Sequence, residues 1–286
     1  MREHVSISEI REFQACPLRW WYRYENGLWT EKTSSFFALG TAVHAGLANW
    51  YEPINGGKKT GDLTMPIKLY QATFADESAK VNWNEESDKD PITQSALGED
   101  MLKAAIFEGD SWTAKAVERT FMADIQHSRL GKLPIKLKSV LDMVTTTNDV
   151  VEHKTATRKW DEGREHGDIQ ATAYVSVVRQ NYDHDPKVTF NIISKHSKGP
   201  NVDRRTTTRT QDDIDRLYVT VRAMLDAKEK GAIYPNPTAF AHATCEFRKL
   251  CDKWESHPQP LPETARGMLT VLPSIRQSAL TKMYGE

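Results

Sequence analysis

Two short apolar segments rich in β-branched residues lie close together near the middle of the chain, at 139–142 and 150–154. The polar residues 145–149 separate them, and this pattern predicts an antiparallel hairpin. A further strand pattern comes before the hairpin at 116–123, and another follows it at 188–193. The first three segments predict three antiparallel strands, and the last is expected to pair with the same sheet.

Apolar residues at helical spacing predict helices before and after these strands. The predicted helices are a short one opened by the capping box Ser6 to Glu9 and ending near Phe13, one over Leu18 to Glu25 that Pro17 opens, one that begins near Gly40 and carries Val43, Leu47 and Trp50, one from Asp161 to Tyr182, and one from Asp212 to Lys230. We expect an α/β fold, a mixed central sheet flanked by helices. Its expected parts are N-terminal helices at 1–51, a helical insertion at 52–115, the core at 116–231, and a C-terminal segment and tail at 232–286.

Charge and composition exclude few classes of function. The 286 residues contain 38 lysines and arginines against 39 aspartates and glutamates. Any binding of nucleic acid therefore depends on local basic patches rather than on net charge. No apolar run reaches the length of a membrane span, and the first residues lack the apolar core of a signal peptide. We therefore expect a soluble, cytoplasmic protein with no membrane partner.

Acidic and basic side chains gather at the ends of the predicted hairpin strands. Asp142 ends the first strand, and Glu152 and Lys154 end the second. Residues two apart in a strand share a face, so Glu152 and Lys154 project together while His153 points away. An aspartate, a glutamate and a lysine at one sheet edge form the arrangement that metal-assisted phosphodiester hydrolysis needs.

Side chains from neighbouring helices can reach this edge. His44 lies one turn after Gly40 and either points into the site or is a structural histidine. Gln170 and Tyr174 share one helix face, where they either face the sheet edge or only make surface hydrogen bonds. A basic stretch after the last strand is either a solvated loop or binds phosphates beside the site. It contains Lys195, His196, Lys198, Arg204, Arg205 and Arg209.

Three cysteines, an odd and small number, argue against a disulfide framework and favour free thiols or metal ligands. Cys16 lies near the start of the chain, whereas Cys245 and Cys251 follow His242 near its end. Three thiols and one imidazole suit zinc or an iron-sulfur cluster. The alternative is that three unrelated thiols fall at these positions by chance.

The order of these motifs resembles the RecB-type branch of the PD-(D/E)XK nucleases. It is similar to the iron-sulfur exonucleases that include the AddB nuclease domain and the CRISPR-associated adaptation exonucleases. The shared motifs are Ser6-x-Ser8 with Cys16-Pro17-x-x-Trp20, Gly40-x3-His44, Asp142, Glu152-x-Lys154, Gln170-x3-Tyr174 and the C-terminal ligand cluster. Each motif alone is modest, but six in the same order are specific. The resemblance implies a restriction-endonuclease-like core, stapled by a metal cluster that joins the two ends of the chain.

The resemblance also implies roles for the residues at the sheet edge. His44, Asp142 and Glu152 would bind a catalytic Mg²⁺ or Mn²⁺, together with the backbone carbonyl of His153. Lys154 would orient or activate the attacking water and stabilise charge at the phosphate. These roles describe a metal-dependent hydrolase of DNA.

Further roles follow from the same resemblance. Gln170 and Tyr174 would position the scissile strand. A four-iron, four-sulfur cluster would be held by Cys16, Cys245 and Cys251, with His242 in the place of the family's remaining cysteine. Because of that replacement, a structural zinc ion is the alternative.

The expected function is a DNA exonuclease that acts on single strands or duplex ends in recombination, repair or DNA processing. The alternatives are a catalytically silent DNA-binding protein on the same fold, an end-independent or flap endonuclease, and a zinc-stapled structural protein. The sequence lacks a phosphate loop with Gly-Lys-Ser/Thr, so unwinding would need a helicase or recombination partner. A nuclease of this length resembles phage and CRISPR-associated members of the family, and a phage protein would act in the host cytoplasm.

Overall fold

The computed structural model describes most of the chain as two compact units. The described residues are 3–29, 33–52, 62–86, 90–108, 112–239, 242 and 245–254. The first unit comprises Met1–Ile7 and Thr33–Arg222, and the second comprises Ser8–Lys32 and Ala223–Glu286. The tail predicted at the C-terminus lies outside the described residues from 255 onward. Within the part of the chain that is described, no helix is long and apolar enough to cross a membrane.

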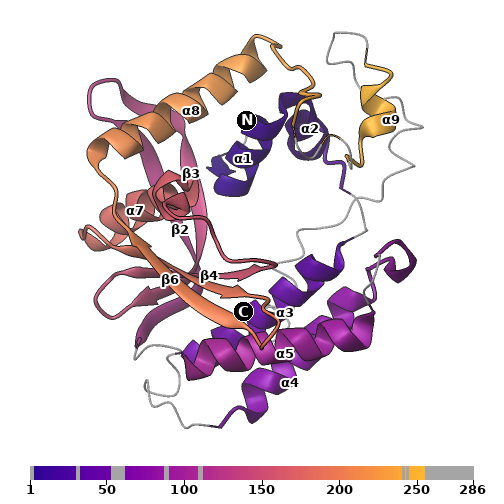
Figure 1. Ribbon diagram of the computed structural model, residues 1–286. Coiled ribbons are helices and arrows are strands. Elements are labelled where there is room, and N and C mark those ends of the chain that lie inside the picture. The colour runs from indigo at the N-terminus through magenta and orange to yellow at the C-terminus, as the bar shows by residue number, and fades with distance from the viewer. Residues whose placement is uncertain are drawn as a thin grey trace. The chain divides into compact units, whose positions relative to one another are not determined.

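A mixed sheet of six strands forms the centre of the first unit (Figure 1). The strands are β1 (His4–Ser6), β2 (Ala114–His127), β3 (Gly131–Thr145), β4 (Val150–Ala156), β5 (Val188–Ser194) and β6 (Asn201–Thr207). Their order is β1-β3-β4-β5-β6, and β2 also pairs with β3. The β1–β3 and β4–β5 pairs are parallel, and the other pairs are antiparallel. The predicted hairpin and the open mixed sheet are therefore confirmed.

Strand β3 changes its neighbour along one edge, and this change creates a gap in the sheet. Residues 136–138 pair with β1, whereas the end of β3 pairs with β4 through only two residue pairs. Residues 139–142 lie between these two pairings, while β2 covers most of the opposite edge of β3. β3 and β4 thus part directly after their hairpin. We refer to residues 139–142 of β3 and 152–154 of β4 as the fork.

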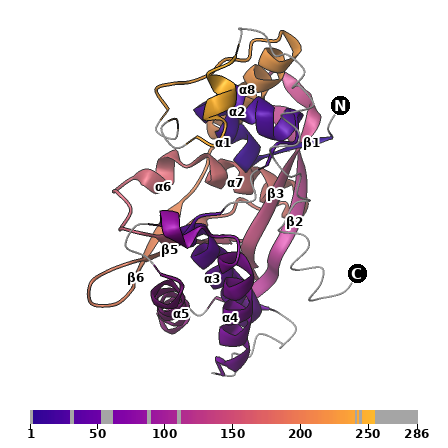
Figure 2. The same cartoon turned by 90° about the vertical axis from the view of Figure 1, so that its right-hand side faces the viewer.

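Helices cover the two faces of this sheet (Figures 1 and 2). In the first unit they are α3 (Ser35–Tyr51), α4 (Thr64–Ser78), α5 (Pro91–Phe107), α6 (Arg164–Gly167) and α7 (Ile169–Tyr182). Helices α3, α4 and α5 enclose one apolar core with the sheet, to which Val151 of β4 belongs. The next residue, Glu152, points the other way and meets Tyr174 of α7. Because successive strand residues face opposite sides, α7 lies on the face opposite α3.

Helix α3 begins five residues earlier than the predicted start near Gly40. The hydroxyl of Ser34 accepts a hydrogen bond from the backbone N–H of Phe37 at 3.2 Å, and this cap starts the helix at Ser35. Gly40 instead lies inside the helix, where a Cβ atom would be 2.9 Å from Oγ1 of Thr155. The glycine therefore allows α3 to approach β4 closely beside the fork.

The single helix predicted from Asp161 to Tyr182 is wrong in its first half. Asp168 is extended and separates the short α6 from α7. Its carboxylate accepts a hydrogen bond from the backbone N–H of Gln170 at 2.9 Å. An aspartate in this position caps a new helix, so α7 starts just before Gln170.

The loop predicted to carry six basic residues after β5 is also wrong. Residues 201–207 form β6, which pairs antiparallel with all of β5. Only a short turn remains between the strands. Strand β1 and the first half of β3 were also not predicted, because β1 has only three residues and the alternating Leu133, Ile135 and Leu137 of β3 lie among lysines and a proline.

The second unit holds the N-terminal helices and the end of the described chain. Its elements are α1 (Ile7–Ala15, from Ser8 onward), α2 (Pro17–Trp20), a π-helical turn (Trp21–Glu25), the last residues of α8 (Gln211–Glu229) and α9 (Arg248–Cys251). The indole of Trp20 is buried and donates to Glu9 at 3.1 Å. The backbone N–H of Leu18 donates to the carbonyl of Tyr234 at 3.0 Å, which joins the two separated parts of this unit.

Candidate active site

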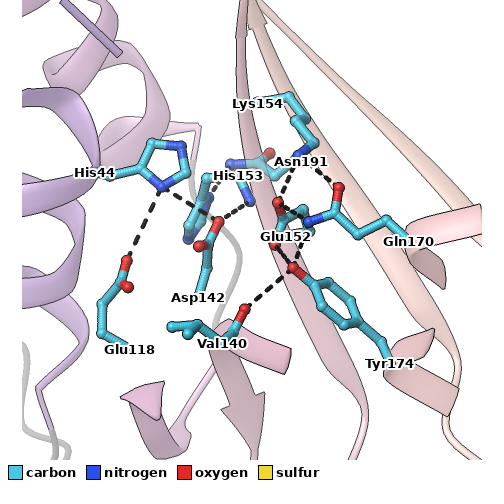
Figure 3. Close-up of polar contacts among 10 residues, drawn as sticks. All are labelled: His44, Glu118, Val140, Asp142, Glu152, His153, Lys154, Gln170, Tyr174 and Asn191. Carbon is cyan, nitrogen blue, oxygen red and sulfur yellow. Dashed lines mark hydrogen bonds and ion pairs between the residues drawn. The ribbon is translucent and has the colours of Figure 1, made fainter. Parts of the chain in front are cut away.

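Three potential metal ligands from three different elements meet at the fork (Figure 3). They are His44 of α3, Glu118 of β2 and Asp142 of β3. Nδ1 of His44 lies 3.3 Å from Oδ2 of Asp142 and 4.0 Å from Oε1 of Glu118. One ligand atom from each residue lies within 4.8 Å of the others. We refer to these three residues as the metal-ligand cluster, because an imidazole and two carboxylates suit Mn²⁺ or a similar divalent ion.

Asp142 is held as a carboxylate in spite of its burial. Its Oδ2 accepts a hydrogen bond from the backbone N–H of His153 at 2.9 Å, which spans the gap between β3 and β4. Burial alone would raise the pKa of Asp142, but the charges of His44, His153 and Lys154 lower it well below its ordinary value. Burial would lower the pKa of His44, but the neighbouring carboxylates, Asp142 first, raise it. Asp142 and His44 therefore each favour the charged form of the other.

Glu152 stands on the other side of the fork, and both its carboxylate oxygens are hydrogen-bonded. Oε1 accepts from Nζ of Lys154 at 2.5 Å and from Nε2 of Gln170 at 2.8 Å. Oε2 accepts from the hydroxyl of Tyr174 at 2.7 Å. Burial and the charge of Asp142 raise the pKa of Glu152, against the opposing charge of Lys154. We refer to Glu152, Lys154, Gln170 and Tyr174 as the Glu152 network.

Helix α7 is positioned so that it can supply half of this network. The hydroxyl of Tyr174 lies 3.2 Å from the carbonyl oxygen of Val140, whose strand edge has no strand partner at that point among the described residues. Gln170 also accepts from Nζ of Lys154 at 2.9 Å and donates to the hydroxyl of Tyr174. Side chains of α7 therefore occupy the gap in strand pairing, where they hold Glu152 and Lys154 in place.

Arg209, predicted as part of a phosphate-binding stretch, instead anchors the start of α7. Its buried guanidinium donates to the carbonyl oxygens of Glu165 and Asp168 and to the hydroxyl of Thr172, at 2.9 to 3.0 Å. Such a group is fully engaged by the protein. It is not available to a DNA phosphate.

The other residues of that basic stretch fall into two classes. Arg204 lies over the ring of Trp112, and Arg205 pairs with Asp203 at 2.9 Å. The exposed turn between β5 and β6 carries Lys195, His196 and Lys198. The backbone N–H of Lys195 donates to the carbonyl of Ala156 at 2.9 Å, so this turn lies close to the end of β4 that bears Lys154.

His153 lies between the residues of the fork but faces the α3 side. Its buried ring stacks on Tyr51, with 5.7 Å between ring centroids, and its Nδ1 lies 3.1 Å from Nδ2 of Asn191. Burial, followed by the nearby charges of His44 and Lys154, lowers the pKa of His153 to about 4. The ring is therefore neutral, and only its backbone is at the fork.

The structure brings together the side chains that the sequence singled out at the sheet edge, and it adds Glu118. The sequence analysis missed this residue because nothing in the strand pattern 116–123 marked it. Its φ of 46° is left-handed and unusual for a glutamate inside a strand. In register Glu118 lies between residues paired with Met143 and Leu141, and so it stands opposite Asp142. The only sequence signal for Glu118 would have been an assumed antiparallel register between 116–123 and the next strand, which places Glu118 opposite Asp142.

All three cysteines lie in the second unit. Cys16, Cys245 and Cys251 are partly buried free thiols. Burial, followed by the negative charges that Cys251, Cys16 and Cys245 carry as thiolates, raises the pKa of Tyr22 to about 12. Burial also raises the pKa of the Cys245 and Cys251 thiols. For His242 the structure shows a backbone contact, in which its carbonyl accepts from the N–H of Cys245 at 3.3 Å.

The arrangement of the fork agrees with a comparison of the whole sequence to protein families. The model of the PD-(D/E)XK nuclease superfamily matches residues 4–252. The chain belongs to this superfamily. Membership of this superfamily identifies the protein as a nuclease. PD-(D/E)XK nucleases generally use divalent metal ions. The metal-ligand cluster fits that requirement.

Solved structures share this fold. A protein from Eubacterium rectale, provisionally named an exonuclease, aligns over 92% of this chain and 92% of its own, with a TM-score of 0.55 and 14% identity. The protein SSO0001 aligns over 86% of this chain and 87% of its own at 11% identity, with a TM-score of 0.37. No curated protein matches the sequence.

Proposed function

We propose that the protein is a metal-dependent DNA exonuclease that hydrolyses phosphodiester bonds in single-stranded DNA or at DNA ends. The observation that carries this proposal is the fork, where the metal-ligand cluster and Lys154 of the Glu152 network face one gap in the sheet. The name of the Eubacterium rectale protein supports the choice of exonuclease. Recombination, repair or related DNA processing is the setting that suits this activity.

The residues of the fork divide the work of phosphodiester hydrolysis. His44, Asp142 and Glu152 would hold Mg²⁺ or Mn²⁺ with the backbone carbonyl of His153. The bound ion would supply Lewis acidity that activates water and offsets negative charge on the phosphate. The ammonium of Lys154, fixed by Glu152 at 2.5 Å, provides a second positive charge beside the reacting phosphate.

Gln170 and Tyr174 keep the Glu152 carboxylate and the Lys154 ammonium in place. Their bonds to Glu152 measure 2.8 and 2.7 Å. Since both residues project from α7 beside the gap, they also suit contacts with the scissile strand. The exposed lysines of the β5–β6 turn would bind backbone phosphates nearby.

Cleavage of matched circular and linear DNA tests this proposal. A labelled single-stranded circle and the same molecule linearised at one site are incubated with the protein and Mn²⁺, with and without EDTA. The exonuclease degrades only the linear form, and EDTA stops it. An end-independent endonuclease cuts both forms, and a silent binding protein shifts both in a gel without cutting either.

We also propose that Cys16, Cys245, Cys251 and His242 hold a four-iron, four-sulfur cluster, with a structural zinc ion as the alternative. All three thiols lie in the second unit, and burial raises the pKa of Cys245 and Cys251, which favours the protonated form of these two. Burying several thiols together is favourable when a metal draws off their protons. The donor set therefore fits a metal centre.

Colour and metal content distinguish the two ions. Protein purified without oxygen is expected to be brown, with broad visible absorption that bleaches on reduction, and to contain iron. A colourless protein that contains zinc would overturn the iron-sulfur assignment and support a structural zinc ion at the same four residues. Absence of both metals from a folded protein would overturn the proposed metal centre as well.

A further inference from the structure

Glu118 occupies a position that a strand residue rarely has. Its backbone is left-handed in the middle of β2, and this turns its side chain toward α3 and the fork. The side chain of Glu118 is 17% exposed, so it is partly accessible to solvent at the edge of the site. Figure 3 shows its carboxylate pointing at the same nitrogen of His44 that faces Asp142.

The two sides of the fork differ in what their carboxylates contact. Both oxygens of Glu152 accept short hydrogen bonds from Lys154, Gln170 and Tyr174. Glu118 and Asp142 instead converge on one imidazole, and one ligand atom from each of these three residues lies within 4.8 Å of the others. The oxygen atoms nearest to a compact binding position are therefore those of Glu118 and Asp142.

We propose that Glu118 is a further ligand of the catalytic cation, which it binds together with His44 and Asp142. This inference rests on the proposed metal-dependent function and adds a residue to it. A second carboxylate beside Asp142 makes the site more anionic and gives it one more hard oxygen donor, the type that Mg²⁺ and Mn²⁺ prefer. With Glu118 as a ligand, only one carboxylate oxygen of Glu152 needs to bind the ion. The other oxygen can stay paired with Lys154.

A different role for Glu118 would be to orient the ring of His44 through a hydrogen bond without touching the ion. Replacement by glutamine separates these roles. Glutamine keeps the length and an oxygen acceptor, so orientation of His44 would survive, whereas the negative charge would be lost. Alanine removes both. A ligand role predicts that Glu118→Gln and Glu118→Ala weaken metal binding alike.

The experiment measures the Kd for Mn²⁺ without DNA, by calorimetry and by the electron paramagnetic resonance signal of free Mn²⁺. The variants are Glu118→Gln, Glu118→Ala and Asp142→Asn, with Glu99→Gln as the matched control. Glu99 pairs with Lys103 on α5, away from the fork. Both Glu118 variants are expected to bind Mn²⁺ at least about tenfold more weakly than wild type, and Glu99→Gln equally well.

Each outcome decides between the proposals. Wild-type affinity in Glu118→Gln overturns the ligand role, whether or not Glu118→Ala is impaired. If Asp142→Asn alone weakens binding, the proposed metal site stands and only Glu118 is removed from it. If Asp142→Asn also binds Mn²⁺ normally, the fork is not the metal site and the proposed function fails with it.

Melting curves without metal guard against misfolding. Glutamine keeps the length and the hydrogen-bonding capacity of Glu118, so Glu118→Gln should melt close to wild type. If neither neutral variant folds, Glu118→Asp keeps the charge on a side chain one methylene shorter. Weaker Mn²⁺ binding by this variant supports the ligand role, and unchanged binding overturns it.

Discussion

The two carboxylates that face each other across the fork have opposite environments. Asp142 lies beside His44 at 3.3 Å and Glu118, and its pKa is lowered. Glu152 accepts three hydrogen bonds, and its pKa is raised, first by burial and then by the charge of Asp142. The same gap in the sheet thus supports one carboxylate that is open to a cation and one that anchors a lysine.

The gap between β3 and β4 therefore provides two different environments for carboxylates. On the α3 side, potential ligands converge, and His44 and Glu118 are partly exposed while Asp142 is buried. On the α7 side, Tyr174 contacts both the carbonyl of Val140 and the carboxylate of Glu152. We therefore expect loss of His44, Glu118 or Asp142 to alter chiefly metal binding, and loss of Lys154 to alter chiefly the rate of cleavage.

The largest effect is expected for Lys154→Ala. Loss of the ammonium beside the phosphate should lower the rate of DNA cleavage at least about a thousandfold, as for the loss of a strong charge stabiliser. Affinity for Mn²⁺ should stay close to wild type, because Lys154 is not itself a proposed ligand of the ion. Cleavage rate and Mn²⁺ titration are measured on the same preparation.

Lys132→Ala serves as the control for this change. Lys132 is an exposed lysine that pairs with Asp124 on the neighbouring strand, and its loss should leave both quantities unchanged. Full activity in Lys154→Ala, or a parallel loss of Mn²⁺ binding, would break the division between the two sides of the fork.

A smaller effect is expected for Tyr174→Phe. The change removes the hydroxyl that bonds Glu152 at 2.7 Å and lies 3.2 Å from the carbonyl of Val140. Cleavage should fall about tenfold to a hundredfold, in the range seen when a group that orients a ligand is lost. Tyr182→Phe, at the end of the same helix, is the control and should cleave DNA normally. Equal rates for the two variants would show that the network does not orient Glu152.

Gly40→Ala should act mainly through stability. The new Cβ would lie 2.9 Å from Oγ1 of Thr155, and because threonine is β-branched, rotation would only bring its methyl group there. Overpacking of this kind costs about 1–3 kcal/mol of unfolding free energy, enough to offset the better helix propensity of alanine. Displacement of α3 would also move His44 and weaken Mn²⁺ binding.

Two variants check this explanation. Gly167→Ala places a Cβ where no atom lies within 4 Å, and it should not destabilise the protein. The double variant Gly40→Ala with Thr155→Ala should recover stability, as measured by denaturant unfolding. A Gly40→Ala protein as stable as wild type would argue against close contact between α3 and β4.

The smallest effect is expected for Lys198→Ala in the exposed β5–β6 turn. If this lysine binds a phosphate, its loss should weaken DNA binding and lower the salt dependence of binding by about one phosphate contact. Arg204→Ala is the contrast, since Arg204 packs over Trp112 and should affect stability instead. Binding measured at several salt concentrations tests both, and an unchanged salt slope in Lys198→Ala would remove the turn from the DNA path.

Much of the sheet could be predicted from the sequence because its hairpin alternates and its turn is polar. The missed parts have a common physical cause, since their structure depends on distant partners. β6 is a polar strand that exists through pairing with β5, and α6 ends where the distant Arg209 binds the carbonyl of Asp168. Local residue patterns cannot report such partners.

The candidate site shows the same limit. Asp142, Glu152 and Lys154 could be found because they are charged residues in two adjacent apolar segments, although β3 and β4 continue beyond them. Glu118 could not, since its approach to His44 depends on a left-handed residue inside a strand. The gap between β3 and β4 could not be predicted either. It depends on β1, from the start of the sequence, which pairs with a part of this edge of β3 that β4 leaves unpaired.

The central claim is that the α3 side of the fork binds a divalent cation, and a crystal grown with Mn²⁺ tests it most directly. Anomalous scattering locates the ion without any assumption about activity. The account predicts one strong peak within about 2.0–2.6 Å of oxygen or nitrogen atoms of His44, Glu118 and Asp142. A well-ordered fork without a peak, or a peak bound only by residues outside it, would contradict the account.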